Sequence, residues 1–167
     1  MKRDAGVSEA VSFIFVLLMI LLLAAGVVLY GVPYIEEKKS TAESDSVLEQ
    51  FSSLVSGMDE LVLTKTYGVK RHAVFPAKYG TLSLSSDSDK RFALIYDSVS
   101  AKDIVFDGGV LSCGEYALRS AAGYMPAAAA DAADAAAQKD TAVLSYSLLR
   151  IWEDNGMTYA EFLVRFV

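Results

Sequence analysis

The chain has 167 residues, 53% of them hydrophobic, which is enough for one domain with an anchoring segment but not for two full domains. Its formal net charge of -6 argues against nucleic acid or an anionic lipid surface as the partner of its polar part. The single cysteine, Cys113, excludes an internal disulfide and a cysteine-based metal site.

The first predicted element is an apolar helix. No charged residue occurs between positions 10 and 35. A bilayer span needs about 20 apolar residues, and a helix pairs every backbone group inside the membrane. We therefore expect residues 7–35 to cross the cell membrane once and to anchor an extracellular C-terminal domain. Lys2 and Arg3 favour a cytoplasmic N-terminus, although the bias is weakened by Lys38 and Lys39 at the other end.

Two details of this segment predict its behaviour. Pro33 lacks a backbone N–H and clashes with the preceding turn, so we expect a kink or break at residues 29–33. The alternative to a permanent anchor is a secretory signal cleaved near residues 24–26. Such a signal has an apolar region of about 7–15 residues, whereas this apolar run continues to Val32.

The next element, residues 36–66, is predicted to be an extended amphipathic helix. Its apolar residues recur at three- and four-residue steps, which is typical of one buried helical face. We expect this face to pack on the sheet of the same domain, the alternative being a seam against a partner helix. The apolar stripe comprises Val47, Leu48, Phe51, Leu54, Val55, Met58, Leu61 and Val62.

Residues 67–167 are predicted to form a β-rich globular head. Short alternating segments at 81–85, 91–96, 103–106 and 110–111 are separated by turn sequences, which favours a small antiparallel sheet. The dipeptide Asn155-Gly156 between two apolar segments predicts a further hairpin. The fold class is therefore α+β, with the amphipathic helix packed on the sheet. The expected core is Phe51, Leu54, Met58, Leu61, Phe92, Leu94, Tyr96 and Val105.

Within the head, residues 126–138 are rich in alanine and are predicted to be a helical insertion. Pro126 fits the first helical position, and alanine has the highest helix propensity. Asp131 and Asp134 would share one face of this helix and keep it soluble.

The polar residues indicate no catalytic site, no metal ion and no cofactor. His72 is the only histidine and is expected at the surface. Asp87 and Asp89 could bind a hard cation, but a solvated hairpin loop explains them better. The segment 112–114 carries a serine and a cysteine without a histidine nearby, so a nucleophile there is not expected. We expect a protein that is not an enzyme.

The N-terminus carries the most informative ionisable group, Glu9, which directly precedes the apolar run. One interpretation is that the Glu9 carboxylate, at the edge of the bilayer, reaches to the membrane surface. The other is that it pairs with a cation from a neighbouring subunit. Basic residues, a small residue at Gly6, the sequence Val7-Ser8-Glu9 and the uncharged helix together resemble the class III signal of archaeal type IV pilins and archaellins. Gly31-Val32-Pro33 is similar to the Gly-x-Pro element of that group.

This resemblance implies a function in a cell-surface filament. A prepilin peptidase would remove residues 1–6 by cutting between Gly6 and Val7, and the freed helices would pack with copies of themselves or with other pilin-like subunits. The new amine on Val7 would then be paired by Glu9 of an adjacent subunit. The alternative is an uncleaved, single-pass protein whose tethered extracellular domain binds an envelope partner.

Overall fold

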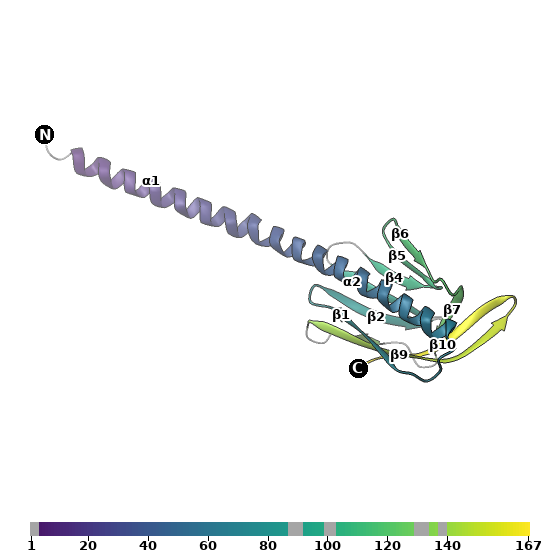
Figure 1. Ribbon diagram of the computed structural model, residues 1–167. Coiled ribbons are helices and arrows are strands. Elements are labelled where there is room, and N and C mark those ends of the chain that lie inside the picture. Colours follow the sequence, from purple (N-terminus) through teal and green to yellow (C-terminus); the bar gives the residue numbers. More distant parts are fainter. Residues whose placement is uncertain (1–3, 87–91, 99–102, 129–133, 137–139) are drawn as a thin grey trace. The chain divides into compact units, whose positions relative to one another are not determined.

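The computed structural model describes residues 4–86, 92–98, 103–128, 134–136 and 140–167 (Figure 1). The chain divides into two compact units, residues 1–38 and residues 39–167, and we call the second unit the head. Helical structure fills the described part of the first unit, whereas the head combines the end of the helix with ten described strands. This order of elements confirms the α+β class.

The helical part consists of α1 (Asp4–Gly26), the π-helix η1 (Val27–Gly31) and α2 (Val32–Leu63). A kink or break was expected at residues 29–33; the π-helix η1 overlaps this range up to Gly31, and α2 then continues through Pro33. The irregularity takes the form of the π-helical turn just before it. In a π-helix, the amide of residue i+5 donates to the carbonyl of residue i. The carbonyl four residues before a proline can therefore accept a hydrogen bond from the residue that follows the proline.

The amphipathic helix ends where the sequence leaves the apolar stripe. Lys65 adopts a positive φ of 51°. The amides of Lys65 and Thr66 donate to the carbonyls of Val62 (3.2 Å) and Leu61 (3.0 Å). These two bonds form a Schellman motif, which satisfies the last carbonyls of α2 and redirects the chain into the first strand.

The head contains two sheets rather than the single small sheet expected. The strand order is β1-β9-β10-β7 in the first sheet and β6-β5-β4-β3-β2-β8 in the second. All described pairings are antiparallel except that of β10 with β7. The strands are β1 (Arg71–Pro76), β2 (Gly80–Ser86), β3 (Phe92–Ser98), β4 (Ile104–Asp107), β5 (Val110–Cys113), β6 (Tyr116–Arg119), β7 (Tyr124–Ala128), β8 (Asp134–Ala136), β9 (Thr141–Asp154) and β10 (Met157–Phe166).

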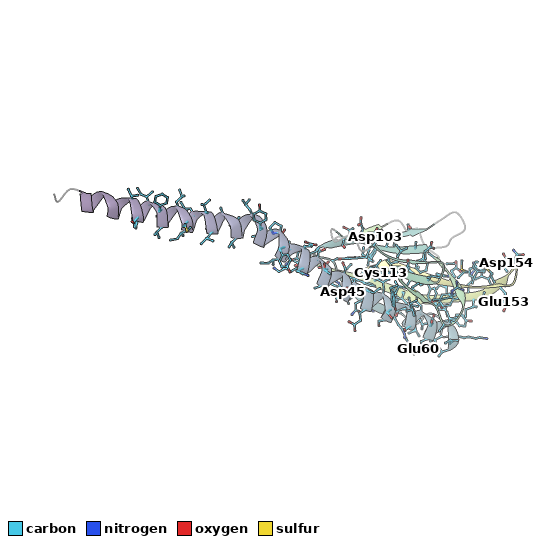
Figure 2. All side chains as sticks on the ribbon, turned by 90° about the horizontal axis from the view of Figure 1, so that it is seen from above. Asp45, Glu60, Asp103, Cys113, Glu153 and Asp154 are labelled. Carbon is cyan, nitrogen blue, oxygen red and sulfur yellow. The ribbon has the colours of Figure 1, made fainter. Side chains whose placement is uncertain are left out.

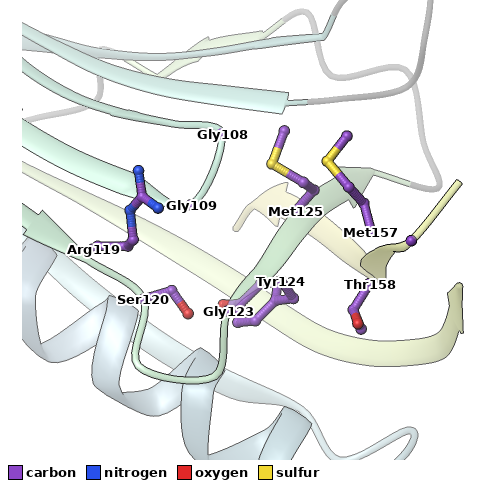
Figure 3. Close-up of a pocket in the computed structure, with 10 residues that line it drawn as sticks. Gly108, Gly109, Arg119, Ser120, Gly123, Tyr124, Met125, Met157 and Thr158 are labelled. Atoms are coloured by element: carbon purple, nitrogen blue, oxygen red, sulfur yellow. The ribbon is translucent and has the colours of Figure 1, made fainter. Parts of the chain in front are cut away.

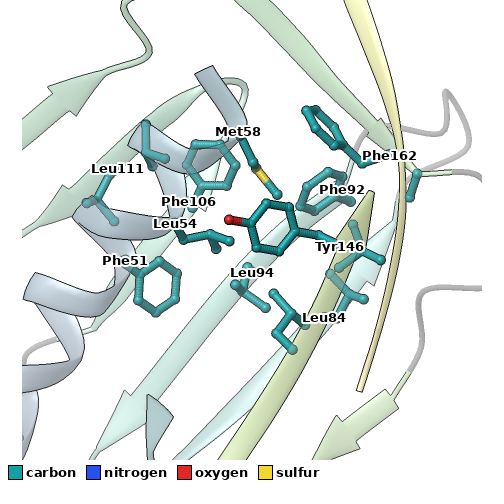
Figure 4. Close-up of a cluster of buried hydrophobic side chains, with 14 of the residues drawn as sticks. Phe51, Leu54, Met58, Leu84, Phe92, Leu94, Phe106, Leu111, Tyr146 and Phe162 are labelled. Atoms are coloured by element: carbon teal, nitrogen blue, oxygen red, sulfur yellow. The ribbon is translucent and has the colours of Figure 1, made fainter. Parts of the chain in front are cut away.

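The core forms where α2 packs on both sheets (Figure 4). Phe51 of α2 lies 5.0 Å from the ring of Phe75 on β1, and both side chains are fully buried. Leu54 and Met58 from the same helical face join Leu94 of β3 in the buried cluster. The apolar stripe of residues 47–62 therefore packs within its own domain, as predicted.

One predicted core residue lies on the wrong face of its strand. Val105 is only half-buried, whereas its neighbours Ile104 and Phe106 are fully buried. Successive residues of a strand point to opposite faces of the sheet, so a prediction that is shifted by one residue assigns the wrong side chains to the core. Leu94 lies directly opposite Phe106 in the ladder, and cross-strand partners share a face. The other seven predicted core residues are buried.

The alanine-rich segment is not a helix where the structure describes it. Residues 124–128 form β7, which pairs in parallel with residues 158–162 of β10, and residues 134–136 form β8 beside β2. Ala127 and Ala128 are buried. Pro126 lies on an edge strand, where its missing N–H costs little. Cross-strand pairing and burial thus override the helix propensity of alanine. Asp131 lies outside the described residues.

Two predicted hairpins are present. Gly108 and Gly109 (φ of 57° and 79°) join β4 to β5, and Asn155 and Gly156 (φ of 51° and 77°) join β9 to β10. Consecutive residues with positive φ form the tight turns that match the twist of antiparallel strands. These turn sequences therefore predicted the local pairing correctly.

A glycine inside α2 has a packing role that gives a testable result. A Cβ at Gly57 would lie 2.4 Å from the hydroxyl oxygen of the buried Tyr146. Helix propensity alone predicts that Gly57→Ala stabilises by about 1 kcal/mol. Because the ring is packed in the core, we expect a net destabilisation of about 1–2 kcal/mol, measured by urea unfolding of the full chain in detergent.

The same substitution in a Tyr146→Phe background provides the control. Without the hydroxyl, the nearest ring carbon lies at 3.5 Å from the added Cβ, an ordinary contact. Gly57→Ala should then be stabilising, so its effect changes sign between the two backgrounds. An effect of equal size and sign in both backgrounds would contradict this role of Gly57.

Candidate membrane-spanning and assembly segment

The apolar helix of the first unit has no face that is covered by its own unit. Every large apolar side chain from Val11 to Ile35 is exposed, with exposed fractions between 46% for Val11 and 80% for Tyr30. Figure 2 shows these side chains projecting around the helix. A helix that is apolar on all sides is typical of a membrane span or a helix core rather than of a surface helix in water.

Its length suits a bilayer. The helix is long and apolar enough to cross a membrane once. At 1.5 Å per residue, the stretch from Val11 to Leu29 measures about 29 Å, close to the ~30 Å hydrocarbon thickness. Tyr30 and Tyr34 follow at the depth where aromatic residues favour the membrane surface. The ammonium of Lys38 lies 5.6 Å from the ring centre of Tyr34, at the polar end of the span.

The predicted processing and pairing residues lie at the other end. Gly6, Val7 and Glu9 all belong to α1, which begins at Asp4, and their side chains lie outside what the structure describes. Glu9 therefore sits on a continuous helix within one turn of Val7, just before the uncharged segment. The pairing between subunits stays a prediction.

In the head, Glu43 is a buried carboxylate that the sequence analysis did not single out. One of its oxygens, Oε1, accepts hydrogen bonds from the Tyr96 hydroxyl (2.6 Å) and the Tyr79 amide (2.9 Å). The other, Oε2, accepts from the Lys78 amide at 3.2 Å. Glu43 precedes the apolar stripe by four residues, which places it on the buried face of α2. These hydrogen bonds connect α2 to the segment before β2 and to β3.

Asp59 makes the equivalent connection near the end of α2. It accepts hydrogen bonds from the Ser120 hydroxyl (2.5 Å) and from the Ala121 amide (2.7 Å). In the sequence, its burial could have been predicted from its position between Val55 and Val62 on the apolar stripe. Both buried carboxylates receive charge-assisted hydrogen bonds from loops of the sheets, so their role is to fix the helix to the head.

Three buried tyrosines predict how the head responds to alkaline pH. Burial raises the pKa of Tyr96, Tyr124 and Tyr146, and the nearby carboxylates of Glu43 and Asp59 add to the effect on Tyr96 and Tyr124, respectively. The folded head retains these protons, whereas the unfolded chain loses them near pH 10. Stability is therefore complete below about pH 10 and falls as the pH rises above it.

We expect the absorbance of tyrosinate in the full chain to rise in two stages. The second stage should coincide with the loss of near-ultraviolet circular dichroism, because these three of the nine tyrosines ionise only on unfolding. The Tyr96→Phe variant should reduce the amplitude of that second stage. Ionisation of Tyr96, Tyr124 and Tyr146 while the head remains folded would contradict the prediction.

The remaining polar candidates are dispersed. His72 is exposed on β1, as expected. Asp87 and Asp89 lie outside the described residues. Ser112 and Cys113 are half-buried on β5. No group of three or more possible metal ligands occurs within the described ranges. The structure thus brings none of these residues together.

A cavity of about 300 Å³ lies beside two of the hairpin turns (Figure 3). The exposed Arg119 and the thioethers of Met125 and Met157 line it. The hydroxyl of Tyr124 is buried and has no hydrogen-bond partner among the described residues. A Cβ at Gly109 would lie 2.6 Å from the carbonyl oxygen of Tyr124, so close strand packing explains this glycine.

Comparisons with known proteins identify no relative. No protein-family model, no curated protein and no solved structure matches this chain significantly.

Proposed function

We propose that this protein is a type IV pilin-like structural subunit of a cell-surface filament. The observation that carries the proposal is the uncovered apolar helix, exposed on every side from Val11 to Ile35 and preceded by Glu9 after the small residue Gly6. Such a helix suits a bilayer, and it also suits the interior of a bundle of its own copies. The acidic head would then lie outside the membrane.

The charge pattern explains how one sequence serves both states. Between residues 10 and 35 the helix has no charged group to oppose transfer from lipid to a helical bundle. A cut between Gly6 and Val7 by a prepilin peptidase would create an amine beside the apolar run. A buried amine is costly unless a carboxylate pairs with it, and Glu9 of the next subunit would supply that carboxylate. No catalytic residue or cofactor is part of this function.

The test is the mass of the mature protein together with its self-association. The full chain is expressed with its native peptidase, carrying either of two C-terminal tags. We expect a mature species beginning at Val7, and we expect each tag to recover the other. An intact leader with no recovery of the second tag would instead establish the alternative, an uncleaved tethered domain that binds another envelope component.

A further inference from the structure

One groove on the head is lined by two cationic side chains and one carboxylate. It has a volume of about 660 Å³ and lies between α2 and the start of β1, with Tyr146 of β9 at its base. We call it the basic groove. Its lining residues are Ser53, Ser56, Gly57, Glu60, Lys70, Arg71, His72 and Tyr146. Its volume falls within the range of about 300–1,000 Å³ that is typical of binding pockets.

Among the described residues, the groove holds one cation that forms no ion pair. Arg71 is neutralised by Glu60, whose carboxylate lies 2.7 Å from its guanidinium. Lys70 is exposed and forms no ion pair among the described residues. Ser53 and Ser56 of α2 also line the groove, and the Ser56 hydroxyl donates to the carbonyl of Ser52 at 3.0 Å. An exposed ammonium that forms no ion pair among the described residues suits a carboxylate ligand.

The hairpin of β9 and β10 presents the complementary feature at its tip. Glu153 and Asp154 are exposed and form no ion pair within the described part of the chain. Behind the tip, the rings of Trp152 and Tyr159 stack at 5.3 Å with an interplanar angle of 12°. The guanidinium of Arg150 lies 4.8 Å from the Trp152 ring centre. These contacts hold the acidic tip in a defined position.

The tip cannot reach the groove of the same molecule. Tyr146 and Asp154 are eight residues apart on one strand, which corresponds to about 26 Å. Figure 2 shows Glu153 and Asp154 at the tip of the β9–β10 hairpin. We propose that the acidic tip of one copy docks into the basic groove of the next. This inference rests on the proposed function and names the contact between heads.

The geometry of this contact gives assembly a direction. Groove and tip are different surfaces, so the contact is heterologous. A pair of copies joined in this way still has one free tip and one free groove. Repetition produces an open chain of subunits where the rotation between copies does not close a ring. Exposed ion pairs are individually weak, so membrane anchoring must supply a high effective concentration. The contact is accordingly expected in membranes and weakens with added salt.

Cysteine cross-linking in membranes tests the pairing. The full-length chain carries Cys113→Ser, together with His72→Cys beside the groove or Met157→Cys beside the tip, both at exposed positions. A short bis-maleimide should yield dimers when the two single-cysteine chains are co-expressed, and a ladder when one chain carries both. Neither single-cysteine chain alone should cross-link. A dimer from His72→Cys alone would overturn the proposal, because it indicates a symmetric contact.

Charge reversal identifies the residues. Lys70→Glu, or Glu153→Lys with Asp154→Lys, should lower the cross-link yield at least fivefold, and combining the two reversals should restore it. Arg165→Glu makes the same charge change as Lys70→Glu, and Glu115→Lys reverses one carboxylate, both at exposed positions elsewhere; these variants should leave the yield unchanged. Loss without restoration would overturn the proposal, because the groove would then take an acidic partner other than the tip.

The two proposals fail separately. If differently tagged chains co-purify but the residue 72 and 157 cysteines never cross-link, the head contact is wrong and the filament function stands. If the chains neither co-purify nor cross-link, both are wrong.

Discussion

Replacing Glu9 with Gln is expected to prevent assembly of the full chain while leaving its insertion into the membrane intact. The substitution keeps the size and hydrogen bonding of the side chain but removes its charge. If the amine of Val7 is buried among apolar helices, it then has no counter-charge. Breaking a buried ion pair on one side costs about 3–5 kcal/mol, which is a factor of roughly one hundred to several thousand in an association constant.

Insertion itself should become slightly easier, because a carboxylate no longer approaches the hydrocarbon. Glu36→Gln is the matched control, since Glu36 is exposed beyond the other end of the uncharged segment. The readout is the recovery of one tagged chain by the other from solubilised membranes. Equal recovery for Glu9→Gln and the parent would show that Glu9 only reaches to the membrane surface.

Truncating Phe51 to Ala is expected to have a comparably large effect, on folding rather than on assembly. Phe51 is fully buried and contacts Phe75, so it joins α2 to the first sheet of the head. Removing a buried phenylalanine ring costs about 3–5 kcal/mol, which is a large share of the 5–15 kcal/mol that stabilises a typical domain. The melting temperature should fall by roughly 10–20 °C.

Phe13→Ala is the matched control on the same continuous helix. Phe13 is 68% exposed, and it lies in the apolar segment rather than in the core of the head. Thermal unfolding of the full chain in detergent, followed by near-ultraviolet circular dichroism, should therefore show no shift for this variant. Equal destabilisation by the two substitutions would mean that the apolar segment contributes to the stability of the head as much as the buried face of α2 does.

The local features of this protein followed from its sequence. An uncharged run of sufficient length is a helix in a bilayer whatever surrounds it, because lipid offers no partner for the backbone. The apolar stripe of α2 could be predicted because its apolar residues repeat with the helical period over four turns. The Asn155-Gly156 turn was predicted because few residue pairs accept two consecutive positive φ angles.

The tertiary structure decided what depends on distant partners. Alanine at 127 and 128 is strand because β10 lies beside it, although its own propensity favours a helix. Ile104 and Phe106 face the core instead of Val105 because the ladder with β3 sets the register.

The burial of two carboxylates was also decided by the tertiary structure. Glu43 and Asp59 are buried because amides and hydroxyls up to 62 residues away hydrogen-bond to them. A short sequence window contains periodicity and turn chemistry, but the donor that compensates a buried charge belongs to another part of the chain.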